Sequence, residues 1–211
     1  MSVLSRPVNV TGFVSVPRPD VTNLVEQVLM GPWKHAAVCI ALHYECLLTA
    51  RDVAGRWTDG NDRPYRRVEW QKGDLWWRGL HMEDIELGAD VTISLPGMTA
   101  PVIFDRSECG LLIETLSEFR GRQRKGPIAR MSTGHPWPDA EAHDHSIRGL
   151  VRAAKFNKRV SAPAFGVNDL QVSGIYKALE AGMSIDDLHM RATSGGRPHF
   201  SRGMSSPSGR F

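Results

Sequence analysis

The first candidate for chemistry is a histidine in the short stretch 32–35, which reads PWKH. An imidazole can accept or donate a proton near neutral pH, so a histidine there can act as a general base or acid. Trp33 adds a face for stacking, and Lys34 adds a charge for a phosphate. A single histidine is more often structural, so the argument for His35 as a catalytic residue rests on these neighbours.

A second candidate is the stretch 135–145, HPWPDAEAHDH, in which six of eleven residues could bind a metal: His135, Asp139, Glu141, His143, Asp144 and His145. The spacing lacks the two histidines, four residues apart, of a helical zinc motif. Two prolines predict an irregular loop. The pattern therefore favours a hydrated polar loop over a metal site, and we assign no metal and no cofactor.

Basic residues are concentrated in the second half of the chain, although the net charge is only +3. Residues 119–159 contain ten Lys or Arg against three acidic residues, and residues 191–211 contain four Arg against none. Such clustering indicates a polyanionic partner, while a solvated helix face is the alternative.

Part of this charge follows a helical pattern. Ser146 can cap a helix with Ile147, Leu150 and Val151 on its apolar side. The opposite side carries basic residues at spacings of four, three and four, which form one continuous face: Arg148, Arg152, Lys155 and Arg159.

The stretch 194–211, SGGRPHFSRGMSSPSGRF, is rich in glycine and serine and has three arginines but no acidic residue. Such composition is typical of a disordered tail. The alternative is a loop whose backbone approaches an anion closely, and the basic character of the preceding region favours that alternative.

The elements that must position these residues follow from hydrophobic periodicity. Alternation predicts a strand over 8–16, and an apolar stripe predicts a helix over 20–30, capped by Asp20 and closed by Gly31. The apolar run 35–50 predicts one or two strands, with a buried helix as the alternative. A hairpin is expected over 66–79, two short strands within 91–104, and a helix over 109–119.

This order predicts an α+β fold, with a ferredoxin-like (RRM-type) domain and inserted hairpins over 1–120. Residues 121–211 form a basic, helical and loop-rich half. Its first part, 120–138, has three Gly and three Pro and predicts a linker or a long functional loop. Residues 169–190 predict a helical pair, which is either a packing element or a DNA-binding helix-turn-helix.

Bulk properties limit the class of protein. At 211 residues and 41% hydrophobic content, the chain can bury a substantial core. No apolar run has the length of a membrane span, and residues 1–10 lack a signal-peptide pattern, so we expect a cytoplasmic protein. The three cysteines have no paired spacing and are expected to be buried.

Together, the predicted strand, the amphipathic helix, the phrase VLMGPWKH, the basic helix and the terminal GGRPHFSRGMSSPSGRF resemble the CRISPR repeat-RNA processing endoribonucleases of the RAMP superfamily. In that family a ferredoxin-like domain carries a histidine after its first helix, an arginine-rich helix enters the groove of the repeat hairpin, and a glycine-rich segment lies near the C-terminus. The resemblance covers scattered stretches, about a third of the chain.

The resemblance implies metal-independent cleavage of RNA, in which the 2′-OH attacks the adjacent phosphate and leaves a 2′,3′-cyclic phosphate. It implies His35 as the catalytic histidine and Ser194 as a donor to the developing negative charge. RNA-binding roles follow for eleven basic residues: Lys34, Arg120, Arg122, Arg124, Lys125, Arg148, Arg152, Lys155, Arg159, Arg197 and Arg202.

Two alternatives stay open. A RAMP subunit that binds the 5′ end of the guide RNA without cleaving it, beside other subunits of an effector complex, would share the fold and the basic surfaces. A DNA-binding protein would use the helical pair, although its second helix opens with Asp186 and Asp187, which repel phosphates.

Overall fold

One buried helix lies at the centre of the computed structural model, which describes residues 12–59, 71–72, 75–96, 98, 100–119 and 125–192. This helix, α2 (Lys34–Glu45), is buried without interruption from Ala37 to Glu45. The predicted strands over 35–50 are therefore wrong there, and the alternative of a buried helix is correct. A helix that is covered on every side is apolar throughout and shows no amphipathic period, so the sequence pattern does not distinguish a buried helix from buried strands.

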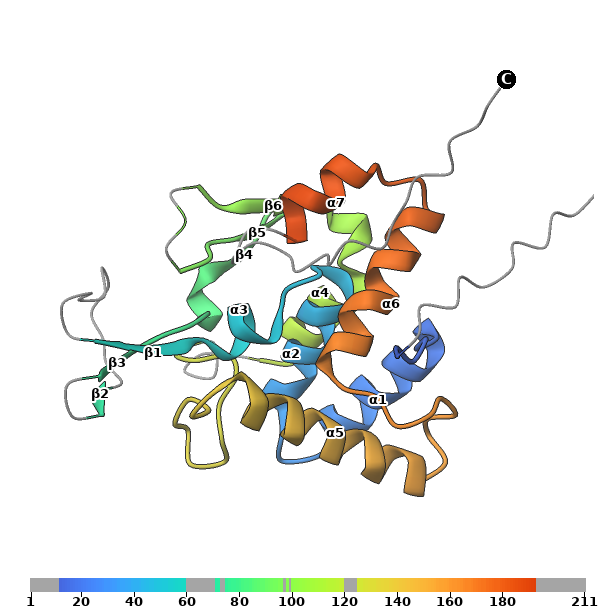
Figure 1. Cartoon of the computed structure of the whole chain (residues 1–211), viewed down its shortest axis with the longest axis horizontal. Coiled ribbons are helices and arrows are strands. Elements are labelled where there is room, and N and C mark those ends of the chain that lie inside the picture. Colours follow the sequence, from blue (N-terminus) through green and yellow to red (C-terminus); the bar gives the residue numbers. More distant parts are fainter. Residues whose placement is uncertain are drawn as a thin grey trace, which may run out of the picture.

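Other helices surround α2 on several sides (Figure 1). It packs against α1 (Arg18–Met30), α4 (Gly110–Ser117) and α6 (Val167–Glu180), and it also contacts α3 (Ala50–Ala54). The longest helix, α5 (Ala140–Phe156), packs against α1 and α3, and α7 (Ile185–Ala192) packs against α6. A Cβ on Gly174 would lie 2.0 Å from the Tyr44 carbonyl oxygen, so α6 approaches α2 this closely only because residue 174 is glycine.

Polar side chains of α2 tie it to its neighbours. The buried carboxylate of Glu45 accepts hydrogen bonds from the backbone amides of Leu111 and Leu112, at 3.2 and 2.9 Å. These amides belong to the first turn of α4, where a helix has unpaired donors and a positive dipole end. Arg18 of α1 pairs with the same carboxylate at 3.2 Å. One buried acid therefore joins three helices.

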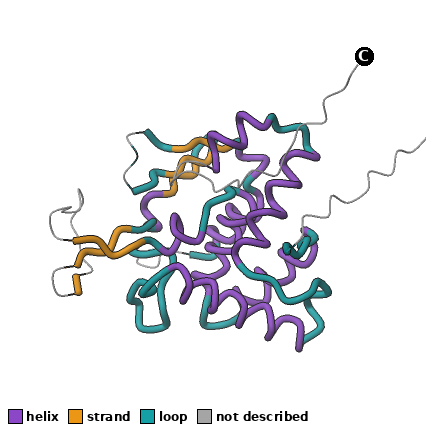
Figure 2. Tube along the Cα trace, in the orientation of Figure 1, coloured by secondary structure: helices purple, strands orange, loops and turns teal. Residues whose placement is uncertain are grey.

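The strands form two small antiparallel sheets beside the helices (Figure 2). In one, the order is β1 (Arg56–Asp59), β3 (Leu75–Arg78) and β2 (Gln71–Lys72). The pairing of β2 with β3 confirms the described part of the hairpin predicted over 66–79, whose residues 66–70 and 73–74 lie outside the described residues. In the other, β5 (Val91–Ile93) lies between β4 (Ile85–Leu87) and β6 (Val102–Phe104), which confirms the two predicted short strands. Two 3-10 turns, Met82–Asp84 and Arg106–Glu108, flank this second sheet.

The structure is a mixture of helices and antiparallel sheets, as an α+β prediction requires, but the ferredoxin-like arrangement is not confirmed. The described strands make two sheets of three, whereas that fold needs one sheet with strands on both sides of its first helix. Residues 8–11 of the strand predicted over 8–16 lie outside the described residues, and residues 12–16 are not a strand. After α1 the chain forms α2 rather than a strand, so no βαβ unit starts there.

Helix starts also differ from expectation. The predicted helix over 20–30 is confirmed, but it begins at Arg18, with Pro17 as its N-cap, so the Asp20 cap is wrong. The basic helix begins at Ala140 and not after Ser146, because the Asp139 side chain accepts a hydrogen bond from the Ala142 amide. The helix over 109–119 and the helical pair over 169–190 are confirmed as α4 and as α6 with α7.

Residues from both sides of position 120 share one hydrophobic core, from Val16 in the first half to Leu170 in the second. All three cysteines are buried in it, as expected. None of the described helices has the length and apolar character that crossing a bilayer requires.

Asp20 makes tertiary hydrogen bonds instead of capping α1. Its carboxylate accepts hydrogen bonds from the Ala162 amide at 2.7 Å and from both the amide and the hydroxyl of Ser161. Burial by itself raises the pKa of Asp20, but these hydrogen bonds outweigh burial and the net pKa is lowered. The carboxylate therefore joins α1 to the segment that follows α5.

We predict that Asp20→Asn lowers the free energy of unfolding by about 2 kcal/mol at pH 7, because the variant has no charged acceptor for these hydrogen bonds. The folded-state pKa is lowered, so this stabilisation is full above the ordinary pKa of 3.8 and disappears as pH falls through the folded-state value. Urea unfolding of both proteins at pH 7 and at lower pH measures the difference. Asp90→Asn, at an exposed aspartate in a turn, is the matched control. An equal decrease in both variants would contradict the prediction.

Candidate functional site

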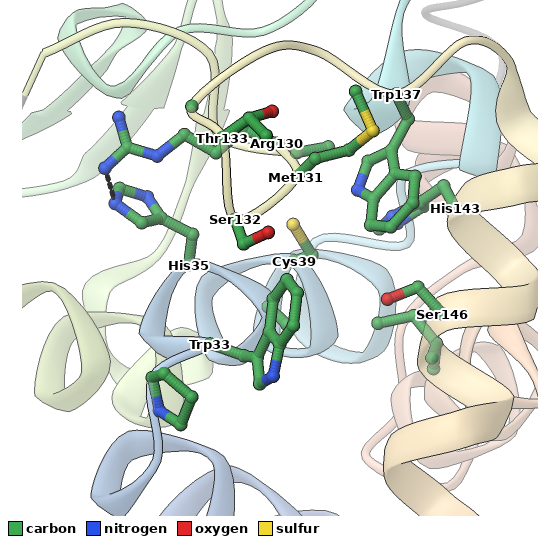
Figure 3. Close-up of a pocket in the computed structure, with 15 residues that line it drawn as sticks. Trp33, His35, Cys39, Arg130, Met131, Ser132, Thr133, Trp137, His143 and Ser146 are labelled. Atoms are coloured by element: carbon green, nitrogen blue, oxygen red, sulfur yellow. Dashed lines mark hydrogen bonds between the residues drawn. The ribbon is translucent and has the colours of Figure 1, made fainter.

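A cavity of about 330 Å³ lies between the start of α2, the loop before α5, and α5 itself (Figure 3). This volume is within the range of ligand pockets, roughly 300–1,000 Å³. His35, the predicted catalytic residue, lies on its wall together with Arg130 from the loop and His143 from α5. The start of α2 and a stretch about a hundred residues later in the sequence therefore meet at one hollow.

The loop before α5 is held in a defined shape. Arg130 and Pro136 form an isolated antiparallel bridge, and the Met131 amide donates to the His135 carbonyl at 2.8 Å. Gly134 has φ of +84°, a conformation that favours glycine, and its amide closes the turn onto the Met131 carbonyl at 2.9 Å. This geometry places the hydroxyls of Ser132 and Thr133 on the cavity wall. The predicted long loop over 120–138 therefore lines the cavity in its described part, residues 125–138.

His35 and Arg130 form a hydrogen-bonded pair at the cavity wall, in which the Arg130 guanidinium donates to Nε2 of His35 (Figure 3). Burial, and then the charge of Arg130, lower the pKa of His35 to about 4, so the imidazole is neutral at pH 7. Since Nε2 accepts, the proton of the neutral ring lies on Nδ1. Among the described residues, this buried Nδ1 has no hydrogen-bond partner. The ring of Phe119 contacts the imidazole, with centroids 4.8 Å apart.

A second pair of histidines lies behind the opposite wall. Nδ1 of His43 is 2.8 Å from the carbonyl oxygen of Leu48, and Nε2 of His43 is 3.0 Å from Nε2 of His143. Burial lowers the pKa of His43 to about 4, and burial together with His43 lowers the pKa of His143 to about 3. Both rings are neutral, and the pair joins α2 to α5.

Aromatic and sulfur groups complete the wall. Trp33 is 38% exposed and Trp137 is half-buried, so each offers part of its indole surface to the cavity. Burial raises the pKa of the Cys39 thiol, which keeps it protonated and removes it as a nucleophile. The hydroxyl of Ser146 comes from α5.

Two side chains of the predicted basic stripe are half-buried and bonded to other groups of the protein, and the other two are exposed. Arg148 pairs with Asp144 at 2.7 Å, and Asp144 also accepts from the Val167 amide at the start of α6. Lys155 donates to the Ala162 carbonyl at 2.7 Å. Arg152 and Arg159 are exposed, and Phe156 between them is 89% exposed. Two cations and one aromatic ring therefore face solvent at the end of α5.

The other predicted RNA-binding residues fall into two groups. Lys34 is half-buried beside the cavity, in the first turn of α2, and Lys125 is exposed at the start of the described part of the loop. Ser194 and five arginines lie outside the described residues: Arg120, Arg122, Arg124, Arg197 and Arg202.

The stretch 135–145 is not the irregular loop that its composition predicted, because Ala140 onward is helical. His143 points into the core toward His43, which separates it from the exposed His145. Across the described part of the chain, no group of three or more His, Cys, Asp or Glu residues is placed to hold a metal ion.

Sequence reasoning missed Arg130, His143 and Trp137 as site residues. Arg130 stood in the basic, Gly- and Pro-rich segment that was interpreted as a functional loop, and this composition was its only signal. His143 was one of the six candidate metal ligands, and Trp137 stood in the same stretch without a role of its own. Nothing in the sequence indicates that they meet His35.

The arrangement suits recognition of a nucleotide or phosphodiester. A neutral histidine can accept a proton, a guanidinium can bind phosphate oxygens, hydroxyls can donate hydrogen bonds, and indole rings can stack on bases. Comparison of the chain with protein-family models, with curated proteins and with solved structures found no match.

Proposed function

We propose that this protein binds RNA and cleaves a phosphodiester bond at the cavity without a metal ion. One observation carries the proposal: a neutral histidine is hydrogen-bonded to an arginine on the wall of a ligand-sized cavity that also presents hydroxyls and indoles. Attack of the 2′-OH on the adjacent phosphate needs a base that takes the proton and a cation that binds the phosphate. His35 and Arg130 supply these two groups at one place.

The reaction proceeds through exchange of hydrogen-bond partners. A phosphate binds a guanidinium more strongly than a neutral imidazole does, because the hydrogen bond is assisted by charge. The substrate phosphate therefore draws Arg130 from His35 and exposes Nε2. That nitrogen takes the proton of the 2′-OH, the 2′-oxygen bonds to phosphorus, and the bond from phosphorus to the 5′-oxygen breaks. The 5′-oxygen leaves with a proton from solvent, and a 2′,3′-cyclic phosphate remains.

The exposed end of α5 supports a path for the rest of the RNA. Arg152 and Arg159 can neutralise phosphates, and Phe156 offers a ring on which an unpaired base can stack. Ser146 and His143 on the same helix line the cavity. Arg152 lies nine residues after His143, on the opposite side of α5, so a strand that contacts both these cations and His35 must pass around the helix.

The resemblance to RAMP-type proteins implies that the RNA is a CRISPR repeat, and we include this in the proposal. The protein would process the repeat with a ferredoxin-like domain and then stay bound to it with effector subunits. A guide-binding subunit that does not cleave is the second candidate function. The exposed cations and Phe156 on α5 favour it equally, since they support binding without chemistry. The role of His35 separates the two.

We predict that His35→Ala lowers the rate of RNA cleavage by about 100-fold or more, the typical contribution of a general base, and changes RNA affinity little. Single-turnover cleavage of labelled repeat RNA in EDTA, with the product ends identified, measures the rate. His145→Ala, at an exposed histidine of α5, is the matched control. Binding by the wild-type protein without cleavage would favour the guide-binding subunit.

The pH dependence of cleavage gives a second prediction. Because the pKa of His35 is lowered to about 4, the base stays neutral well below the ordinary histidine range. We therefore expect kcat/KM, which reports the free enzyme, to be constant from pH 8 to about pH 5 and to fall about tenfold per unit below pH 4. A fall that begins near pH 6.5 would show that the base is not the buried His35.

We predict that Arg152→Ala combined with Arg159→Ala weakens RNA binding and lowers the slope of log K against log salt by about 0.7 for each phosphate that the variant no longer neutralises. Both side chains are exposed, so the fold should be retained. Arg106→Ala, in the exposed 3-10 turn before α4, controls for removal of a charge elsewhere on the surface. A slope equal to that of the wild type would remove this part of α5 from the RNA path.

A further inference from the structure

Nδ1 of His143, a residue of α5 that lines the cavity, is a buried acceptor whose protonation state is determined by a contact on the far side of His43. The Leu48 carbonyl can only accept, so Nδ1 of His43 carries the proton and donates to it. Nε2 of the neutral His43 then has no proton and must accept from Nε2 of His143. This leaves Nδ1 of His143 without a proton, and among the described residues it has no hydrogen-bond partner.

An unpaired acceptor of this kind is costly. A buried polar atom without a partner costs roughly 1–3 kcal/mol, unless a ligand or an ordered water satisfies it. His143 is 1% exposed and lines the cavity, and its Nε2 edge faces His43, which does not line the cavity. The unsatisfied atom thus marks a place where an N–H donor from a bound molecule would be stabilised.

The two sides of the cavity differ in chemistry. In Figure 3 the His35–Arg130 pair lies on one side and His143, with Trp137 beside it, on the other. A guanidinium favours an anion. An acceptor without a proton disfavours an anion and favours a donor, and an indole favours a flat ring. A phosphate on the first side and a base on the second together make a nucleotide.

We propose that the cavity binds an unpaired adenine or cytosine, and that Nδ1 of His143 accepts a hydrogen bond from the amino group at C6 of adenine or C4 of cytosine. Trp33 and Trp137 provide the apolar surface for the ring. Uracil and hypoxanthine present an oxo group where cytosine and adenine present the amino group, so they would set two acceptors against each other. This inference rests on the proposed function, because it names the base beside the phosphate that His35 and Arg130 bind.

Binding of mononucleotides tests the base contact without requiring cleavage. The probes are two matched pairs, CMP with UMP and AMP with IMP, and ribose 5-phosphate as the ligand without a base. Titration followed by tryptophan fluorescence and by histidine side-chain ¹⁵N spectra gives the dissociation constants and shows the state of His143. We expect at least one amino-bearing nucleotide to bind about tenfold or more tightly than its oxo partner, the cost of an unpaired buried acceptor.

The variant His143→Gln tests the base contact while keeping the hydrogen bond that joins α5 to His43. A glutamine amide nitrogen can replace Nε2 as the donor to His43, but no atom of glutamine replaces Nδ1. We expect this variant to lose the preference for the amino-bearing nucleotide and to keep its affinity for ribose 5-phosphate. His145→Gln, at the exposed histidine two residues later, should keep both. If His143→Gln does not fold, the comparison of the nucleotide pairs on the wild-type protein still decides.

The outcomes are distinct. Equal affinities within both pairs, or a His143 spectrum with the proton on Nδ1, would overturn the base contact, and RNA cleavage that depends on His35 would leave the proposed function intact. A preference for the amino-bearing nucleotide that His143→Gln removes would support the base contact even if no RNA is cleaved. Binding of ribose 5-phosphate as tight as that of every nucleotide would show an anion site alone and overturn the inference.

Discussion

The burial of α2 from Ala37 to Glu45 is the constraint on which the rest of the structure depends. A helix covered on every side cannot leave its polar side chains to water, so each must find a partner on a neighbouring element. Glu45 meets the first turn of α4 and Arg18 of α1, and His43 meets the Leu48 carbonyl and His143 of α5. The polar contacts of one helix thus fix the positions of three others.

The same helix connects the core to the cavity. His35 lies in its first turn, where burial is only partial, and His43 lies eight residues later, just over two turns along the axis. One histidine therefore lines the cavity directly, and the other acts through His143 on the opposite wall. Since both belong to one rigid element, the distance between the His35 side and the His143 side of the cavity is set by the packing of α5 and the loop at 130–136 against α2.

Desolvation determines the protonation states of the histidines in and behind the cavity wall. Burial keeps three histidines neutral, so charge at the described wall is carried by Arg130, whose own pKa burial also lowers. A guanidinium that is bonded to a neutral imidazole can exchange that partner for a phosphate, and the exchange frees Nε2 of the imidazole as a base that has no proton to lose first. On the far wall, neutrality makes the direction of the hydrogen bonds definite, and the Leu48 carbonyl determines which nitrogen of His143 is left without a proton.

The sequence by itself determined the elements whose hydrophobic period is clear, namely α1, α4 and the strands near 71–78 and 91–104, and it identified His35 and the 120–138 loop as candidates. Only the tertiary structure decided that 34–45 is a helix, because a segment buried on every side carries no period. Asp20 and Lys155 are bonded to partners on other segments, and Arg148 pairs with Asp144 within α5. Arg130, Trp137 and His143 meet His35 only because the loop before α5, and α5 itself, lie beside the start of α2. Contacts between residues about a hundred positions apart depend on how whole elements pack, and local pattern carries no information about that.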